Sequence, residues 1–248
     1  KVKVRYPKVV FVKDENSNEY RPVKAIKFLD EKGRVKKELT KKEYKSFHNI
    51  NIAKNRKFIC INDYIGSTKK YEQMFQASIF NTSGELIFAI QQPLSNVYVS
   101  PNGKYVVGTN TLYPEDPVSI YDEKGLVTTI EKTGRGFDID FAYDGSWFAF
   151  VAQMVDRSLT RNAKSNEEMQ KAYTADLIVC DELGNILWRK NQIAQGMGPS
   201  YCKINISTDD RITIMTGVDD YKIYIFDKKG NLLLKEQGSL EQLRRFKE

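Results

Sequence analysis

One short pattern occurs five times along the chain: Asp or Asn, two further residues and a glycine, with an apolar run on either side. The glycines are Gly33, Gly84, Gly125, Gly184 and Gly230, so successive copies lie 51, 41, 59 and 46 residues apart. Glycine adopts a positive φ without steric cost, and an Asp or Asn three residues earlier can accept hydrogen bonds from the turn backbone. The pattern predicts five tight turns between strands, and a period of this size indicates repeated supersecondary units.

A second hairpin precedes each of the last four turns. Alternating apolar residues run into a short turn and out again in NVYVSPNGKYVVGTN from Asn96 and FDIDFAYDGSWFAFVA from Phe137, and the segments from His48 and Cys202 repeat this. Each unit therefore reads as a four-stranded antiparallel meander. A lone meander leaves both faces partly bare, and radial stacking of several meanders buries them. We predict an all-β fold: a β-propeller of about five four-stranded antiparallel blades in a single domain.

The units resemble propeller blades of the broad WD40-like, TolB-like and quinoprotein-like superfamilies. VSPNGKYVV (99–107) is similar to the Ser-Pro-Asp-Gly-Lys hairpin of TolB-type blades. CDELGNILWRK (180–190) resembles the Asp-x-x-Gly-x-x-x-Trp end of quinoprotein-type blades. The resemblance covers units two to five. It implies a propeller and names no specific family.

The domain organisation follows from these units. We assign residues 1–238 to the propeller and residues 239–248 to a short closing segment. This segment is expected to be helical, because Ser239 is a candidate N-cap and apolar residues recur after it at helical spacing. The innermost strand of the first unit is expected at Val2–Tyr6.

Composition and net charge indicate which classes of partner to expect. The chain is 41% hydrophobic and 29% charged, and no run approaches the roughly 18 apolar residues that a membrane helix needs. The net charge of +7 favours an acidic partner such as nucleic acid, anionic lipid or a wall polymer. The densest cluster, KKELTKKEYK from Lys36, is interleaved with acids, which is typical of a solvated face. The aromatic residues mostly alternate within strands, so a nucleic-acid partner is not expected.

The N-terminus and the cysteines bear on the compartment. The chain begins in an alternating strand pattern without an initiator Met, so we expect a trimmed or processed start. The compartment stays open, with an exported or membrane-tethered origin among the alternatives. Cys60, Cys180 and Cys202 each lie inside an apolar strand pattern, and their odd number predicts buried, unpaired thiols.

The connections between the second and third strands vary most in length. The long ones span residues 64–76, 109–117 and 155–174. Because they occur at the same step of the meander, we expect them on one rim, together with the segments 132–137 and 194–201 that join successive units. Repeat proteins often place such insertions on their binding face.

Nine residues on or beside these segments are predicted to contact a ligand. They are Arg135, Asp138, Asp140, Arg157, Arg161, Tyr173, Tyr113, Tyr71 and Met197. Glycines flank Arg135, so the backbone there can approach a ligand closely. In the loop 155–174, Ser165 or Asn166 is a candidate cap for a short helix. Two alternatives stay open: this loop is an insertion without a specific partner, and the two inner-strand aspartates only line a hydrated channel.

The function that we expect is binding rather than catalysis: a scaffold module that recognises a protein or polymeric ligand through loops on one face. No catalytic residue, metal site or cofactor is expected. The only histidine is His48, and no nucleophile elbow, phosphate-binding loop or Cys-x-x-Cys pair is present. The alternative is a five-bladed-propeller glycosidase, which needs paired carboxylates at the central channel. Asp138 and Asp140 could form one such pair, whereas the other units carry mainly amides and a lysine at the comparable positions.

Overall fold

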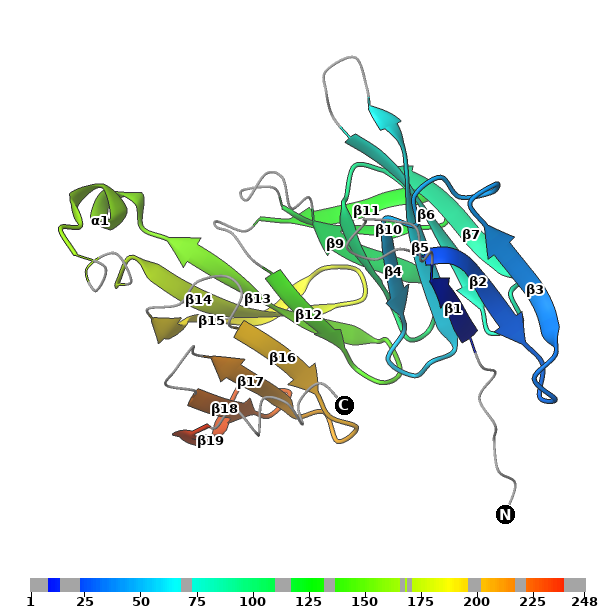
Figure 1. Cartoon of the computed structure of the whole chain (residues 1–248). Coiled ribbons are helices and arrows are strands. Elements are labelled where there is room, and N and C mark those ends of the chain that lie inside the picture. Colours follow the sequence, from blue (N-terminus) through cyan, green and yellow to red (C-terminus); the bar gives the residue numbers. More distant parts are fainter. Residues whose placement is uncertain are drawn as a thin grey trace. The chain divides into compact units, whose positions relative to one another are not determined.

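The computed structural model consists of antiparallel β-sheets joined in chain order (Figure 1). It describes residues 9–13, 23–67, 73–109, 117–131, 137–165, 168, 171–195, 202–216 and 222–238. Within these residues there are five sheets, four with four strands and one with three. The predicted all-β fold of repeated meanders is therefore confirmed. The expected inner strand Val2–Tyr6 and the closing segment 239–248 lie outside the described residues.

Each sheet is a meander in which consecutive strands pair. The first sheet comprises β1 (Val9–Lys13), β2 (Val23–Leu29) and β3 (Val35–Thr40). The second comprises β4 (Asn49–Ile52), β5 (Phe58–Ser67), β6 (Gln73–Asn81) and β7 (Leu86–Gln92). The third comprises β8 (Asn96–Val99), β9 (Tyr105–Thr109), β10 (Val118–Asp122) and β11 (Gly125–Ile130). The fourth comprises β12 (Phe137–Phe141), β13 (Trp147–Val155), β14 (Tyr173–Asp181) and β15 (Ile186–Gln195). The fifth comprises β16 (Cys202–Ile206), β17 (Ile212–Thr216), β18 (Lys222–Phe226) and β19 (Leu232–Gln237).

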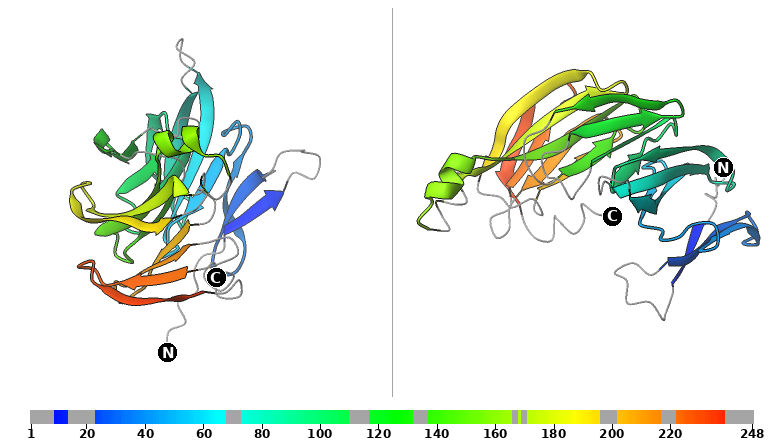
Figure 2. Two further views of the ribbon diagram at one scale, coloured as in Figure 1. Left: turned by 90° about the vertical axis from the view of Figure 1, so that its left-hand side faces the viewer. Right: turned by 90° about the horizontal axis from the view of Figure 1, so that it is seen from above.

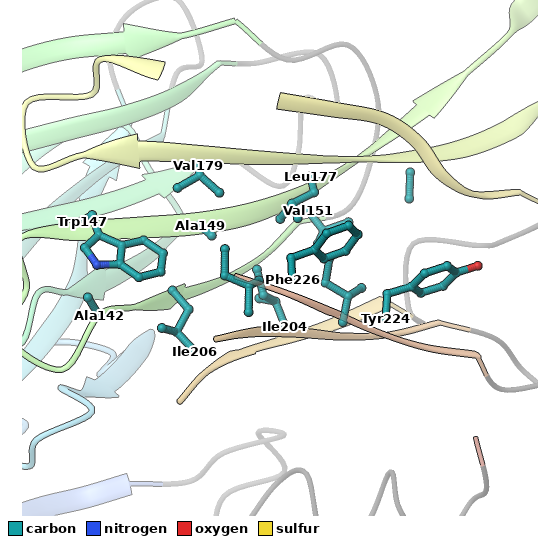
Figure 3. Close-up of a cluster of buried hydrophobic side chains, with 13 residues drawn as sticks. Ala142, Trp147, Ala149, Val151, Leu177, Val179, Ile204, Ile206, Tyr224 and Phe226 are labelled. Atoms are coloured by element: carbon teal, nitrogen blue, oxygen red, sulfur yellow. The ribbon is translucent and has the colours of Figure 1, made fainter. Parts of the chain in front are cut away.

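The chain divides into two compact units, residues 1–108 with 121–125 and residues 109–120 with 126–248. In the first unit, apolar side chains of the first and second sheets form one buried cluster, and side chains of the second and third sheets form another. In the second unit, the fourth and fifth sheets share a buried cluster. Figure 3 shows Trp147, Ala149 and Leu177 of this cluster together with Ile204 and Phe226. Alternation along the strands supplies these faces, as the sequence pattern predicts.

The five Asp/Asn-x-x-Gly turns lie where the sequence predicts them. In the second to fifth sheets each turn joins the third and fourth strands, and in the first it joins the last two described strands. All five glycines have a positive φ. In the first turn, the backbone N–H of Gly33 donates to the carbonyl of Asp30 at 3.0 Å, and Asp30 Oδ1 accepts from the N–H groups of Lys32 and Arg34. The Asp side chain and the glycine are therefore both required by the turn.

Some of these glycines have a second role, because the turn also packs against the preceding sheet. A Cβ added to Gly184 would lie 2.4 Å from Thr128 Cγ2 and 2.8 Å from Ile120 Cδ1. A Cβ on Gly230 would meet the ring of Trp188 at 3.0 Å. Around Gly33, in contrast, there is nothing within 4 Å. One residue type thus satisfies the turn conformation and, at some positions, the close approach of two sheets.

Gly184→Ala and Gly33→Ala separate the two roles, because the φ angles are nearly equal, 85° and 81°. Both variants incur the cost of a positive φ, about 1 kcal/mol, and Gly184→Ala adds roughly 1–3 kcal/mol for overpacking. Urea denaturation of each variant beside the wild type measures the two losses. Equal losses would contradict the packing of this turn against the third sheet.

A buried carboxylate holds the segment that leads into the second sheet. Asp63, on β5, is 4% exposed. Its oxygens accept hydrogen bonds from the backbone N–H groups of Lys45 (2.8 Å), Ser46 (2.7 Å) and Phe47 (3.1 Å) and from the Ser46 hydroxyl (2.9 Å). Buried backbone donors without partners are costly. One side chain therefore fixes the connection between β3 and β4.

Asp63→Ala removes the acceptor of all four bonds and should reduce the free energy of unfolding by about 3 kcal/mol or more. Chemical denaturation measures this loss, with Glu236→Ala on the exposed strand β19 as the control. A loss below about 1 kcal/mol would show that the segment 45–47 finds other partners.

Candidate binding surface

The fourth sheet carries the longest connection between its second and third strands. β13 and β14 pair continuously from Trp147↔Asp181 to Val155↔Tyr173, over nine residues each. The corresponding strands of the fifth sheet have five residues each. Beyond the last pair, the N–H of Asp156 donates to the carbonyl of Ala172 at 2.8 Å. The ends of the expected loop 155–174 are thus strand, and the connection itself spans residues 156–172. We call these residues the hairpin tip.

The hairpin tip contains a helix that the sequence analysis missed, α1 (Arg157–Asn162), at the far end of β13 and β14 (Figures 1 and 2). Asp156 is its N-cap, and Asp156 Oδ1 accepts from the N–H groups of Ser158 (2.9 Å) and Leu159 (3.1 Å). Asp is among the strongest N-cap residues, and this was the signal available in the sequence. Leu159 is 47% exposed, and Arg161 is also exposed.

The predicted cap later in the same connection is confirmed. Ser165 Oγ accepts from the N–H of Glu168 at 3.2 Å, and Glu168 Oε2 accepts from the N–H of Lys164 at 2.7 Å. Glu168 and Lys171 are helical. This reciprocal arrangement resembles a capping box. The hairpin tip therefore has defined local structure at both of its described ends.

The nine predicted contact residues fall into three groups. Those outside the described residues are Arg135, Tyr113, Tyr71 and Met197. Those brought together on or beside the hairpin tip are Arg157 and Arg161 of α1 and Tyr173, the first residue of β14. Those on the innermost strand of the fourth sheet are Asp138 and Asp140. The side chains of Arg157 and Tyr173 lie outside what the structure describes.

Asp138 and Asp140 connect the fourth sheet to the fifth. Asp138 Oδ2 accepts from the backbone N–H of Ile204 at 3.0 Å, and Asp140 Oδ2 accepts from that of Ile206 at 2.6 Å. Lys203 Nζ lies 3.5 Å from Asp138 Oδ1. Both carboxylates therefore have a structural task, and their contact with a ligand stays a prediction.

The first unit contains one such connection, with an amide in place of the carboxylate, and a second contact of a different kind beside it. Asn51 Oδ1 accepts from the N–H of Val99 at 2.9 Å, and Asn49 Nδ2 donates to Asn96 Oδ1 at 3.3 Å. Counted back from the following turn, Asn49 and Asn51 occupy the positions of Asp138 and Asp140. A polar inner-strand residue that reaches the next sheet is thus a repeated feature of this fold.

Further buried polar groups lie outside the predicted site. Asp176, on β14, accepts from Arg189 Nε at 3.2 Å, from Arg189 Nη2 and from the N–H of Gln192 at 2.8 Å. Gln192 has a φ of 52°, so the carboxylate stabilises an irregular stretch of β15. The sequence analysis identified neither Asp176 nor Asp63, because both lie inside strand patterns and their partners are distant in sequence.

The described residues also bear on metal, thiol and membrane chemistry. Among them, no group of three or more His, Cys, Asp or Glu side chains could hold a metal ion. The three cysteines are unpaired; Cys60 and Cys180 are buried as predicted, and Cys202 is partly buried. Burial raises the pKa of the Cys180 and Cys202 thiols to about 12, so both are protonated at neutral pH. In the described part of the chain, no helix is both long enough and apolar enough to cross a membrane.

Asp138 makes stability depend on pH. Burial raises the pKa of its carboxyl group, and the opposing effects of Lys203 and the Ile204 N–H are smaller. A raised folded-state pKa means that the folded protein binds this proton more tightly than the unfolded chain. Relative to Asp138→Asn, the wild type should lose stability as the pH rises from about 4 through the folded-state pKa.

The measurement is the difference in free energy of unfolding between wild type and Asp138→Asn across this pH range. Asp144→Asn is the control, because hydrogen bonds from Ser146 lower the pKa of Asp144 and the difference should have the opposite sign. A pH-independent difference for Asp138→Asn would contradict the effect of burial.

Comparisons with known proteins support the fold. No family model and no curated protein matches the chain. The solved structure of the Dos1 propeller has a TM-score of 0.52 at 9% identity, with 87% of this chain and 54% of that one covered. BamB from Moraxella catarrhalis has a TM-score of 0.53 at 11% identity, with 88% of this chain and 60% of that one covered. This chain thus spans less than two thirds of either protein. At these identities the likeness concerns the fold alone, and together with the five meanders it shows a β-propeller of about five blades.

Proposed function

We propose that this β-propeller is a binding module that recognises a protein or polymeric ligand through the hairpin tip. The observation that carries the proposal is the extension of β13 and β14 into a long, fully paired hairpin that ends in a capped helix. A rigid scaffold that presents a variable connection is the usual arrangement of a recognition loop. The sequence length of this connection, residues 156–172, far exceeds what a hairpin turn needs.

Order in the hairpin tip supports a role in binding. The cap at Asp156, the capping pair of Ser165 and Glu168, and the closing bond to Ala172 hold the backbone before any partner arrives. A preorganised loop loses less conformational entropy on binding than a loose one. Arg161, exposed on α1, is of the residue type most often found at interface hot spots.

The charges of the hairpin tip favour an acidic partner. Its two described acids, Asp156 and Glu168, direct oxygens at backbone N–H groups. Arg161 and Lys164 are exposed. Arg161 and Lys164 are thus exposed cations of the described part of the tip, and carboxylate or phosphate groups of a partner would complement them.

The glycosidase alternative has less support. A glycosidase needs one carboxyl group to donate a proton and another to act as nucleophile or base. Asp138 and Asp140 both accept hydrogen bonds from the next strand, and equivalent positions of the second sheet carry Asn49 and Asn51. Because Asn51 accepts the equivalent bond in the second sheet, the bond made by Asp140 gives no reason to assign catalysis to that carboxylate.

Replacement of Arg157–Lys171 by Asn-Gly tests the proposal. The Asp156 N–H and the Ala172 carbonyl are already hydrogen-bonded, and Asn-Gly forms the two-residue turn that suits such a pair. The melting temperature should remain close to that of the wild type, whereas quantitative capture of partners from a cell extract should be lost. Capture that survives the replacement would refute the hairpin tip as the binding surface.

Point variants give the matched comparison. Arg161→Ala should weaken capture by roughly tenfold, as truncation of an interface arginine often does. Leu159→Ser should also weaken it, whereas Leu187→Ser should not, although the two leucines are 47% and 49% exposed. Equal effects of the two leucine variants would mean that general surface polarity, and not the hairpin tip, controls capture.

A further inference from the structure

The positive charge of the chain is concentrated at its N-terminal end. Residues 1–45 contain 15 of the 39 Lys and Arg residues but only 7 of the 32 Asp and Glu residues. They are therefore net positive by eight, and the remaining residues, with 24 basic and 25 acidic side chains, are net negative by one. The net charge of +7 is thus a property of the first sheet and its flanking segments, not of the whole surface.

Three exposed lysines lie at one end of the first sheet. Ala25 of β2 pairs with Thr40 of β3, so Lys24 lies beside the turn that follows Thr40. In this turn the N–H of Tyr44 donates to the Thr40 carbonyl at 3.0 Å, and Lys42 lies within it. Lys45 follows, its backbone held by Asp63. We call Lys24, Lys42 and Lys45 the lysine corner; all three are exposed.

The described acids near the lysine corner form hydrogen bonds or ion pairs with other groups. Glu38 lies 3.5 Å from Lys27 Nζ, and Glu43 Oε2 accepts from the N–H of Thr40 at 3.0 Å. The carboxylate of Asp63 is buried against three backbone N–H groups. Among the described residues, no ion pair involves the lysine corner. Its three side chains are therefore exposed, without an ion-paired carboxylate in the part of the chain that the structure describes.

The residue types of the lysine corner favour one class of anionic partner, lipid headgroups, over nucleic acids and acidic proteins. The corner contains lysine and no arginine, and a lysine ammonium is a point charge rather than a fork for bidentate recognition. The rings of the half-buried Tyr44 and of Phe47 stack on each other with their centroids 5.6 Å apart, and Phe47 is 2% exposed, so its ring is not offered to a base or to an interface pocket. Nucleic acids and protein partners usually meet Arg and aromatic side chains, whereas diffuse lysine charge suits lipid headgroups.

We propose that the lysine corner binds the surface of an anionic lipid bilayer. Lysines that approach such a surface each strengthen binding by roughly fivefold, and the attraction fades within a Debye length. Binding is weak and reversible, and it orients the first sheet toward the bilayer. The proposal involves none of the residues of the hairpin tip and does not depend on the proposed function.

Vesicle co-sedimentation tests the proposal. The full chain should bind phosphatidylglycerol–phosphatidylcholine vesicles and not pure phosphatidylcholine vesicles, and added salt should weaken binding. Lys24→Glu, Lys42→Glu and Lys45→Glu combined should reduce binding by roughly a hundredfold or more. The same triple with Gln should give a smaller loss in the same direction. If the charge-reversed protein fails to fold, the triple Gln variant tests the proposal in its place.

The control changes net charge equally at other exposed lysines: Lys104→Glu, Lys190→Glu and Lys229→Glu combined. This variant should retain most of the binding, as should the protein whose hairpin tip is replaced by Asn-Gly. Equal losses in the two charge-reversed triples would overturn the proposal in favour of net charge alone. It would also be overturned by a lack of binding to anionic vesicles, or by duplex DNA binding that depends on the lysine corner while vesicles are not bound.

Discussion

The innermost strand of each sheet has a free edge, and the backbone N–H groups on that edge need acceptors. The preceding sheet supplies them through polar side chains: Asn51 accepts from Val99, and Asp138 and Asp140 accept from the fifth sheet. These bonds tie consecutive sheets together at the inner strand. Some consecutive sheets make a second contact near the outer strand, where a turn glycine packs against the preceding sheet. At the third and fifth sheets these polar side chains supply acceptors that apolar packing alone could not give to the edge N–H groups.

The parts of the fold that could be predicted from sequence are those with local causes. A positive φ at glycine and the period of two along a strand act within a few residues, so the turns and most strands were predicted correctly. The bond from Ile204 to Asp138 joins residues 66 positions apart, and nothing local in the sequence indicates it. Asp63 was missed for the same reason. The helix α1 was missed because its six residues give no apolar period, and the N-cap at Asp156 was its one signal.

The electrostatic partners of charged side chains are also difficult to predict from sequence. In the sequence, the acids between the lysines of residues 36–45 suggest local neutralisation and a solvated face. In the structure, Glu38 is paired with Lys27 on the adjacent strand, and Glu43 accepts from a backbone N–H. Alternation of charge along the sequence therefore does not identify the ion pairs, because Glu38 pairs across the sheet and Glu43 bonds to a backbone N–H. Interaction surfaces of a repeat protein have to be identified after its acids have been assigned to turns and caps.

The choice between amide and carboxylate at the inner strands is not determined by the fold. Asn51 accepts the N–H of Val99 in the first unit as Asp140 accepts that of Ile206, so this bond needs an acceptor but not a charge. Burial raises the pKa of Asp138, which means that its charged form is destabilised in the folded protein. At the equivalent position the second sheet has Asn49, which is neutral and donates to Asn96 Oδ1 rather than accepting a backbone N–H. Stability does not explain this difference, and Lys203, 3.5 Å from Asp138, compensates for the charge only in part. The fold therefore accounts for an acceptor on this strand, and the contact of Asp138 with a ligand remains a prediction from its place on the innermost strand, directly after the segment 132–137.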